Sequence, residues 1–231
     1  KNLEKLELKK VYFKGNIKFI NQLDNNEIKN INENILIKKR FWFAASTHKE
    51  EEIFCLKTHL KIKKKYKDIL TIIAPRHIER AQDIKSLSKK FNFEAQILNK
   101  GEPIMKKKEI IIINSFGVLQ EYFKFSKSVF MGKSLIQKLK NDSGQNPIDA
   151  AKLKCKIYHG PYVSNFHEIY DLFNKHKVSE KIHNVEELSN KISMDLNKSN
   201  RIDSEKIEII NNLGKKILND TCNELDKMLN K

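Results

Sequence analysis

Four consecutive isoleucines, Ile110-Ile111-Ile112-Ile113, form a run that is typical of a β-strand buried on both faces. Other short apolar runs occur on both sides of it, and we expect each to be a strand: 41–45, 69–74, 95–98, 129–131 and 157–159. Amphipathic stretches alternate with these runs, and we expect each to be a helix: 50–64, 77–91, 117–125, 146–153 and 165–176. The alternation predicts an α/β fold, a Rossmann-like parallel sheet with helices on both faces.

The two ends of the chain depart from this alternation. Near the start we expect a strand at 11–13 and a turn at Lys14-Gly15-Asn16, and after Val178 the pattern becomes helical. The later helices are predicted at 185–196 and 207–229, the second with Gly214 inside it. Three parts are therefore expected: an entry segment at 1–39, a Rossmann-like domain at 40–182 and carboxyl-terminal helices at 183–231.

The composition is that of a globular protein with a large positive charge. Of the 231 residues 39% are hydrophobic, enough for a sizeable core, and no apolar run of about 18 residues could span a bilayer. The net charge is +16, and from His183 onward eight Lys/Arg face nine Asp/Glu, or −1. The remaining +17 belongs to the preceding residues. Since the chain begins at Lys1, we expect it to be part of a longer product.

The charge has several possible origins. Lysine, isoleucine and asparagine are all abundant, as in proteins of AT-rich genomes, while a functional charge would serve nucleic acid, an anionic membrane or a phosphorylated substrate. The lysine-rich runs 61–67 and 106–108 contain one tyrosine and none, which disfavours a nucleic-acid partner. Cys55, Cys155 and Cys222 lie far apart, so we expect buried or half-buried free thiols and no metal site.

Polar or glycine-bearing turns follow five of the predicted strands. They are Ser46-Thr47-His48, Pro75-Arg76-His77, Asn114-Ser115-Phe116-Gly117, Gly132-Lys133-Ser134 and His159-Gly160-Pro161. Because the carboxyl ends of parallel strands meet at one edge of a sheet, these turns should line one crevice, where open α/β sheets bind ligands. The sequence therefore predicts a ligand site at this edge.

Two of these turns have both structural and functional interpretations. Thr47 and Glu50 have the spacing of a capping box, and the helix that follows could also bind a phosphate at its start. Arg76 is one of only four arginines, and its guanidinium could fork onto phosphate or carboxylate oxygens as lysine cannot. We expect Arg76 to bind an anion and Arg80 to have a structural role.

The segment 143–149 gives the most specific local prediction. Asn146 as N-cap and Pro147 at the first helical position would begin a helix facing the crevice. Asp149 either completes this cap or accepts hydrogen bonds from ribose hydroxyls, and the spacing does not decide between the two. Gly117 either lets the backbone approach a ligand closely or forms a plain tight turn.

Taken together, these residues resemble the 3-deoxy-D-manno-octulosonic acid (Kdo) transferases of lipopolysaccharide assembly, inverting GT-B glycosyltransferases that use CMP-Kdo. The matching stretches occur in family order: Lys14-Gly15-Asn16-Ile17-Lys18-Phe19, Ala45-Ser46-Thr47-His48 with Glu51-Glu52, Ala74-Pro75-Arg76-His77-Ile78-Glu79-Arg80, 114–119, Gly144-Gln145-Asn146-Pro147-Ile148-Asp149, and Gly160-Pro161 with Asn165-Phe166.

The resemblance implies the carboxyl-terminal, donor-binding half of a two-domain enzyme, in which 1–39 enters from a missing amino-terminal half. By motif, CMP would be contacted by Pro75, Arg76, Phe116, Gly117, Val118, Asn146, Pro147, Ile148 and Asp149. The catalytic glutamate and the membrane anchor would lie in the missing half, so this chain alone should not catalyse transfer. The implied partners are CMP-Kdo, a lipid A precursor and the cytoplasmic face of the bacterial inner membrane, without a cofactor, metal or nucleic acid.

The chain departs from the family pattern at several of these positions. It has Asn114-Ser115 for the usual Asp-Thr, Val118 for glutamate, Ser143-Gly144-Gln145-Asn146 for Gly-Gly-His-Asn, and Asp149 for glutamate. Asp149 keeps the carboxylate, whereas Val118 can offer only its backbone amide. Two alternatives remain: another GT-B protein, such as a UDP-sugar transferase or epimerase, and a non-catalytic basic module for nucleic acid or anionic membrane.

Overall fold

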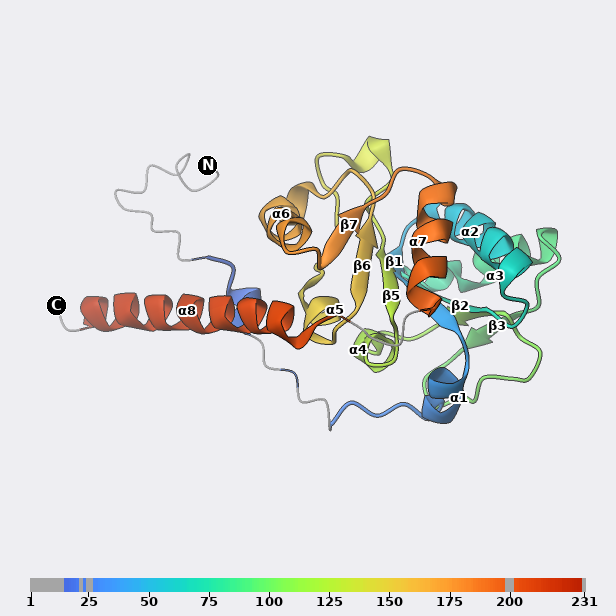
Figure 1. Cartoon of the computed structure of the whole chain (residues 1–231), viewed down its shortest axis with the longest axis horizontal. Coiled ribbons are helices and arrows are strands. Elements are labelled where there is room, and N and C mark those ends of the chain that lie inside the picture. The colour runs from blue at the N-terminus through green and yellow to red at the C-terminus, as the bar shows by residue number, and fades with distance from the viewer. Residues whose placement is uncertain (1–14, 21–22, 24–26, 198–201, 230–231) are drawn as a thin grey trace.

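The computed structural model describes residues 15–20, 23, 27–197 and 202–229 (Figure 1). In this part of the chain seven parallel strands form one sheet in the order β3-β4-β2-β1-β5-β6-β7. The strands are β1 (Phe41–Thr47), β2 (Leu70–Pro75), β3 (Ala95–Leu98), β4 (Ile110–Ile113), β5 (Ser128–Met131), β6 (Lys156–His159) and β7 (Ser179–Lys181). The predicted parallel sheet is thus confirmed, and the strand order reverses between β1 and β5.

The helices cover both faces of this sheet (Figure 1). The α-helices are α1 (Glu33–Lys38), α2 (Glu51–Lys65), α3 (Ala81–Lys90), α4 (Leu119–Phe123), α5 (Ile148–Lys152), α6 (His167–Lys175), α7 (Val185–Asn197) and α8 (Ser204–Leu229). Short 3₁₀ turns are η2 (Ile17–Ile20), η3 (Ile78–Arg80), η4 (Gln137–Leu139) and η5 (Ser164–Phe166). The strand expected at 11–13 lies outside the described residues.

The core consists of two apolar clusters, one on each face of the sheet. In β4, Ile110 and Ile112 belong to the cluster covered by α2, α3 and α7, while Ile111 and Ile113 belong to the cluster under α4, α5, α6 and α8. This alternation follows from the two-residue period of a strand. Each fully buried isoleucine contributes about 1.5–3 kcal/mol relative to exposure, so the four-isoleucine strand stabilises both faces at once.

The inward face of α2 differs from the one that its apolar residues indicate. Ile53 and Leu60 are 40% and 42% exposed, because α2 turns its polar residues Glu51, Glu52 and His59 inward. The sequence pattern did not identify this face because a buried polar group counts against burial unless its partners are known. Strand β7 was missed because it is a short, mostly polar edge strand.

The long helix α8 packs against the sheet domain only through its first half. Its buried residues are Ile207, Ile210, Gly214 and Ile217, and the rest of the helix extends away from the sheet (Figure 1). Gly214 allows η2 to approach, since a Cβ there would clash with the carbonyl oxygen of Phe19. Packing therefore requires a glycine at this position inside the helix.

A buried polar cluster of His59, Thr71 and Glu109 lies at the edge of the sheet where the strands begin. His59 is fully buried, with Nδ1 2.8 Å from Thr71 Oγ1 and Nε2 3.2 Å from Glu109 Oε2. Lys63 pairs with the same carboxylate and helps to hold the pKa of Glu109 below its ordinary value, although burial acts the other way. The ionised Glu109 can only accept, so neutral His59 donates from Nε2, and Thr71 donates to Nδ1.

This cluster predicts a loss of stability in mild acid. Burial lowers the pKa of His59 from 6.5 to about 4, so between these values the unfolded chain binds a proton that the folded chain excludes. Stability should therefore fall as pH drops below 6.5. Between pH 7 and pH 5 His59→Gln should lose about 1–2 kcal/mol less than the wild type, measured by urea unfolding. Equal losses in both proteins would contradict the assignment.

Candidate functional site

Backbone hydrogen bonds join the strand exits at the carboxyl edge of the sheet. The amide of Arg76, just past β2, donates to the carbonyl of Thr47 at 2.9 Å. The amide of Gly132, just past β5, donates to the carbonyl of Ala45 at 2.8 Å. The turns after β1, β2 and β5 therefore meet at the point where the strand order reverses, which is where open α/β sheets form a crevice.

Glu51 connects two of these turns through one buried carboxylate. Its Oε2 accepts hydrogen bonds from the amides of His48 at 3.0 Å and Lys133 at 2.7 Å. Its Oε1 accepts from the amides of Ser134 at 2.9 Å and Leu135 at 3.0 Å. Burial raises the pKa of Glu51, while these four hydrogen bonds oppose the shift. The carboxylate thus fixes the turn after β1 against the turn after β5.

The capping box predicted for this helix is wrong by one residue. Thr47 belongs to β1 and its buried Oγ1 has no hydrogen-bond partner among the described residues, while Glu50 precedes α2 with φ of 83°. Glu51 instead accepts from His48, and its own amide donates back to the His48 carbonyl at 3.0 Å. Only half of a capping box is therefore present: the Glu51 carboxylate accepts from the His48 amide, but the returning hydrogen bond goes to the His48 carbonyl and not to its side chain.

Arg76 and Arg80 follow β2 in different environments. Arg80 donates from Nε and Nη2 to the two carboxylate oxygens of buried Glu52, at 3.1 and 3.2 Å, so the structural role expected for it is confirmed. Arg76 is exposed at the carboxyl edge, directly after buried Pro75. Its guanidinium is the more available of the two for an anion from solution.

Residues 116–118, after β4, have no polar side chain and can offer hydrogen bonds only from their backbone. Phe116 is 65% exposed, Gly117 has φ of 76°, and Val118 is buried with only 4% exposed. Since Ile73 of β2 lies opposite Ile112 of β4, this turn begins beside the turn that carries Arg76. The positive φ of Gly117 explains why glycine stands there.

The segment 146–149 begins its helix later than predicted. Helix α5 starts at Ile148, and Asn146 Oδ1 accepts from the Ile148 amide at 3.1 Å, so Pro147 lies outside the helix and Asp149 is its second residue. Asp149 does not close the cap: its Oδ2 accepts from Gln120 Nε2 at 3.0 Å. Ile148 is fully buried and Pro147 is buried, so here only Asn146 and Asp149 have partly accessible side chains.

The predicted site residues thus all lie at the carboxyl edge. The Gln120–Asp149 hydrogen bond joins the beginnings of α4 and α5, and so holds 116–118 near 146–149. Gln120 was missed because nothing in its sequence position marks it as the partner of Asp149.

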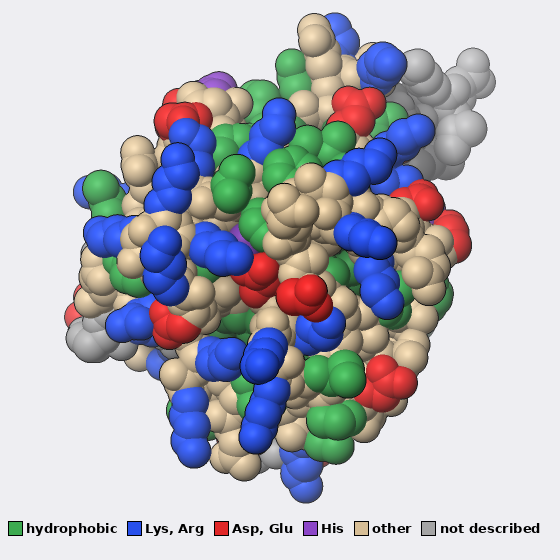
Figure 2. All heavy atoms as spheres, turned by 90° about the vertical axis from the view of Figure 1, so that its right-hand side faces the viewer, with side chains coloured by type: hydrophobic (Ala, Val, Ile, Leu, Met, Phe, Trp, Pro, Cys, Tyr) green, Lys and Arg blue, Asp and Glu red, His purple; other side chains and the backbone are tan. Residues whose placement is uncertain are grey.

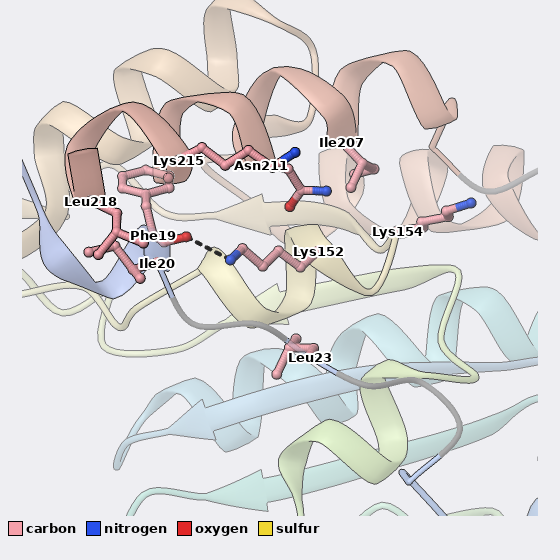
Figure 3. A pocket seen from close by; sticks show the side chains of 10 residues that line it. Phe19, Ile20, Leu23, Lys152, Lys154, Ile207, Asn211, Lys215 and Leu218 are labelled. Carbon is pink, nitrogen blue, oxygen red and sulfur yellow. Dashed lines mark hydrogen bonds between the residues drawn. The ribbon is translucent and has the colours of Figure 1, made fainter. Parts of the chain in front are cut away.

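Two hollows lie away from the predicted site residues. One of about 430 Å³ lies between η2, α5 and α8 (Figure 3), and one of about 530 Å³ lies beside Arg40 and Phe41.

The surface of the molecule carries many basic side chains and one exposed thiol among the described residues. Figure 2 shows lysine and arginine side chains spread over the face that carries α3 and β3, with fewer acidic ones between them. Cys55 and Cys155 are buried, but Cys222 is exposed, contrary to expectation, because it lies on the outer half of α8. Among the described residues no group of three or more metal-ligating side chains gathers, and no helix is long and apolar enough to cross a membrane.

No family model matches the chain, but curated proteins do. It is 29% identical over 164 residues to the 3-deoxy-D-manno-octulosonic acid transferase of Haemophilus influenzae, and 30% identical over 190 residues to that of Rickettsia typhi. The resemblance to the Kdo transferases is confirmed. These alignments cover 70% and 81% of this chain, but only 38% and 40% of the two transferases. The chain thus spans less than half the length of these Kdo transferases.

Solved structures agree on the fold. The C-terminal CMP-Kdo binding domain of WaaA from Acinetobacter baumannii aligns with a TM-score of 0.64 and 21% identity, over 80% of this chain and 91% of that one. A glycosyltransferase from Rickettsia africae aligns with a TM-score of 0.54 and 11% identity, over 88% of this chain and 50% of that one. The fold is therefore that of the carboxyl-terminal domain of GT-B glycosyltransferases, as the Kdo transferase resemblance implied.

Proposed function

We propose that the chain is the donor-binding half of a Kdo transferase and that it binds CMP-Kdo at the carboxyl edge of its sheet. One observation above all supports this: three turns that match the family motif, carrying Arg76, Gly117 and Asp149, lie at the same edge of the fold. A basic module for nucleic acid or membrane would not require such a convergence.

In the proposed complex, Arg76 binds the phosphate and Asp149 accepts hydrogen bonds from the ribose. Val118 offers only its backbone amide, because its side chain is buried. Helices α4 and α5 are single turns, so they contribute individual N–H groups rather than a large dipole. When an acceptor hydroxyl displaces CMP at the anomeric carbon, negative charge gathers on the departing phosphate. Arg76 would stabilise that charge and so lower the barrier.

The remaining parts of the reaction are proposed to lie outside this chain. A lipid A precursor would be presented by an amino-terminal half, which would carry the catalytic glutamate and the membrane anchor. The assembled enzyme would work at the cytoplasmic face of the bacterial inner membrane. Under this proposal, residues 40–182 bind the donor and residues 1–39 connect the two halves of the enzyme. Residues 183–231 form helices that support the donor-binding domain. The chain alone would bind donor without transferring it.

Calorimetric titration with CMP tests the proposed site. Arg76→Ala removes the cation at the phosphate, and Asp149→Asn removes the charge at the ribose while an oxygen remains for Gln120. Each should weaken CMP binding tenfold or more, about 1.4 kcal/mol. Arg40→Ala is the matched control, since Arg40 is an exposed arginine that pairs with Asp68. Unchanged affinity in both site variants, or tighter binding of UDP than of CMP, would overturn the proposal.

A further inference from the structure

A cluster of basic side chains lies beside the proposed nucleotide site without belonging to it. His48 follows β1, His77 follows β2 and Lys133 follows β5, so three strand exits supply the cluster. The rings of His48 and His77 meet edge to face with centroids 5.5 Å apart. Since Glu51 binds the amides of both His48 and Lys133, the backbone on either side is fixed.

The acidic groups near this cluster already have other partners or are exposed to solvent. Glu51 is occupied by four backbone amides, and Glu52 is paired with Arg80. Asp142 contacts Lys133 Nζ at 2.9 Å but is mostly exposed and also accepts from Asn165. Glu79 lies 3.6 Å from His77 Nδ1 and is 72% exposed. Exposed pairs of this kind contribute little to stability, so Lys133 and His77 can exchange these partners for a bound anion.

His48 experiences this potential most directly. Its Nε2 is buried and has no hydrogen-bond partner among the described residues. Its pKa is lowered to about 4, mainly by burial, and the nearby charges of His77, Lys133, Arg76 and Arg80 act in the same direction. A buried ring nitrogen without a partner costs free energy, and neighbouring positive charges oppose protonation of the ring. A bound anion would offset both effects.

We propose that His48, His77 and Lys133 form an anion subsite that takes the carboxylate of the donor's sugar acid. The proposal rests on the proposed function, since a nucleotide-linked sugar acid carries two anions, a phosphodiester and a carboxylate. Arg76 directly precedes His77 in the chain and is assigned to the phosphate, so the phosphate and the carboxylate each have their own donors. Imidazole N–H groups and an ammonium supply the hydrogen bonds that a carboxylate accepts.

The test compares two probes, CMP and CMP-Kdo, in calorimetric titrations of the whole chain. CMP carries the nucleotide and phosphate but no carboxylate, so the difference between the probes reports the sugar. His48→Gln should weaken CMP-Kdo binding tenfold or more and leave CMP binding within twofold. Lys133→Met should give the same split, and it replaces His48→Gln if that variant fails to fold. His176→Gln is the matched control, because His176 is a partly exposed histidine at the end of α6, where the chain turns toward β7.

The outcomes separate this subsite from the function on which it rests. Equal weakening of both probes by His48→Gln would place His48 in the nucleotide site and overturn the subsite. No effect on CMP-Kdo would overturn it as well, and in both cases CMP binding by the wild type would leave the proposed function standing. If the wild type binds neither probe, the proposed function fails and the subsite with it.

Discussion

Glu51→Gln is expected to lower the free energy of unfolding by about 3 kcal/mol. The carboxylate accepts four backbone N–H groups, two on each oxygen. A glutamine has one oxygen and one NH₂ group, and the NH₂ would face two N–H donors, which would both lose their acceptor. An unsatisfied buried donor costs about 1–3 kcal/mol, so two of them give the expected loss. Urea unfolding followed by circular dichroism measures it.

Glu50→Gln is the control for this substitution. Glu50 is the adjacent residue, has the same chemistry and is exposed, so its replacement should change stability by less than about 0.5 kcal/mol. The comparison also separates the observed cap from the one predicted at Thr47 and Glu50. A larger loss for Glu50→Gln than for Glu51→Gln would contradict the structure of this turn.

Gly132→Ala is expected to destabilise the chain by about 3 kcal/mol through a clash between backbones. A Cβ at this position would lie 2.7 Å from the Thr47 Cα and would overlap the Ser46 carbonyl oxygen. These atoms belong to β1, which is held on both sides by β2 and β5, so neither partner can move away cheaply. Thermal unfolding should show the loss as a lowered Tm.

Gly101→Ala serves as the comparison for Gly132→Ala. Gly101 has φ of 82° but open space around its Cβ position, so its replacement adds backbone strain without a clash. The expected loss is about 1 kcal/mol. If Gly132→Ala is no more destabilising than Gly101→Ala, the turns after β1 and β5 do not touch as described.

The sheet could be predicted from sequence because its strands are short apolar runs separated by amphipathic stretches. The four isoleucines of β4 need no knowledge of their neighbours to be recognised as a strand buried on both sides. Strand β7 and the inward face of α2 could not be predicted in this way. Both depend on polar residues whose burial or pairing is decided by segments distant in the sequence.

The candidate site, too, could be predicted only in part from the sequence. That Arg76, Gly117 and Asp149 lie at one edge follows from parallel strands alone. The contacts that fix the edge do not: Glu51 binds amides 82 to 84 residues further along the chain, and Gln120 lies 29 residues from Asp149. Such pairs become neighbours only when the strand order is known.

The outer half of α8 projects from the sheet domain without packing against it. Beyond Ile217 no residue of the helix is buried, and at 1.5 Å per residue the part from 218 to 229 extends about 18 Å past its last buried contact. The helix is anchored at Gly214, where η2 crosses it closely. A force applied near Leu229 would therefore reach the sheet through the contacts that the first half of α8 makes around this crossing.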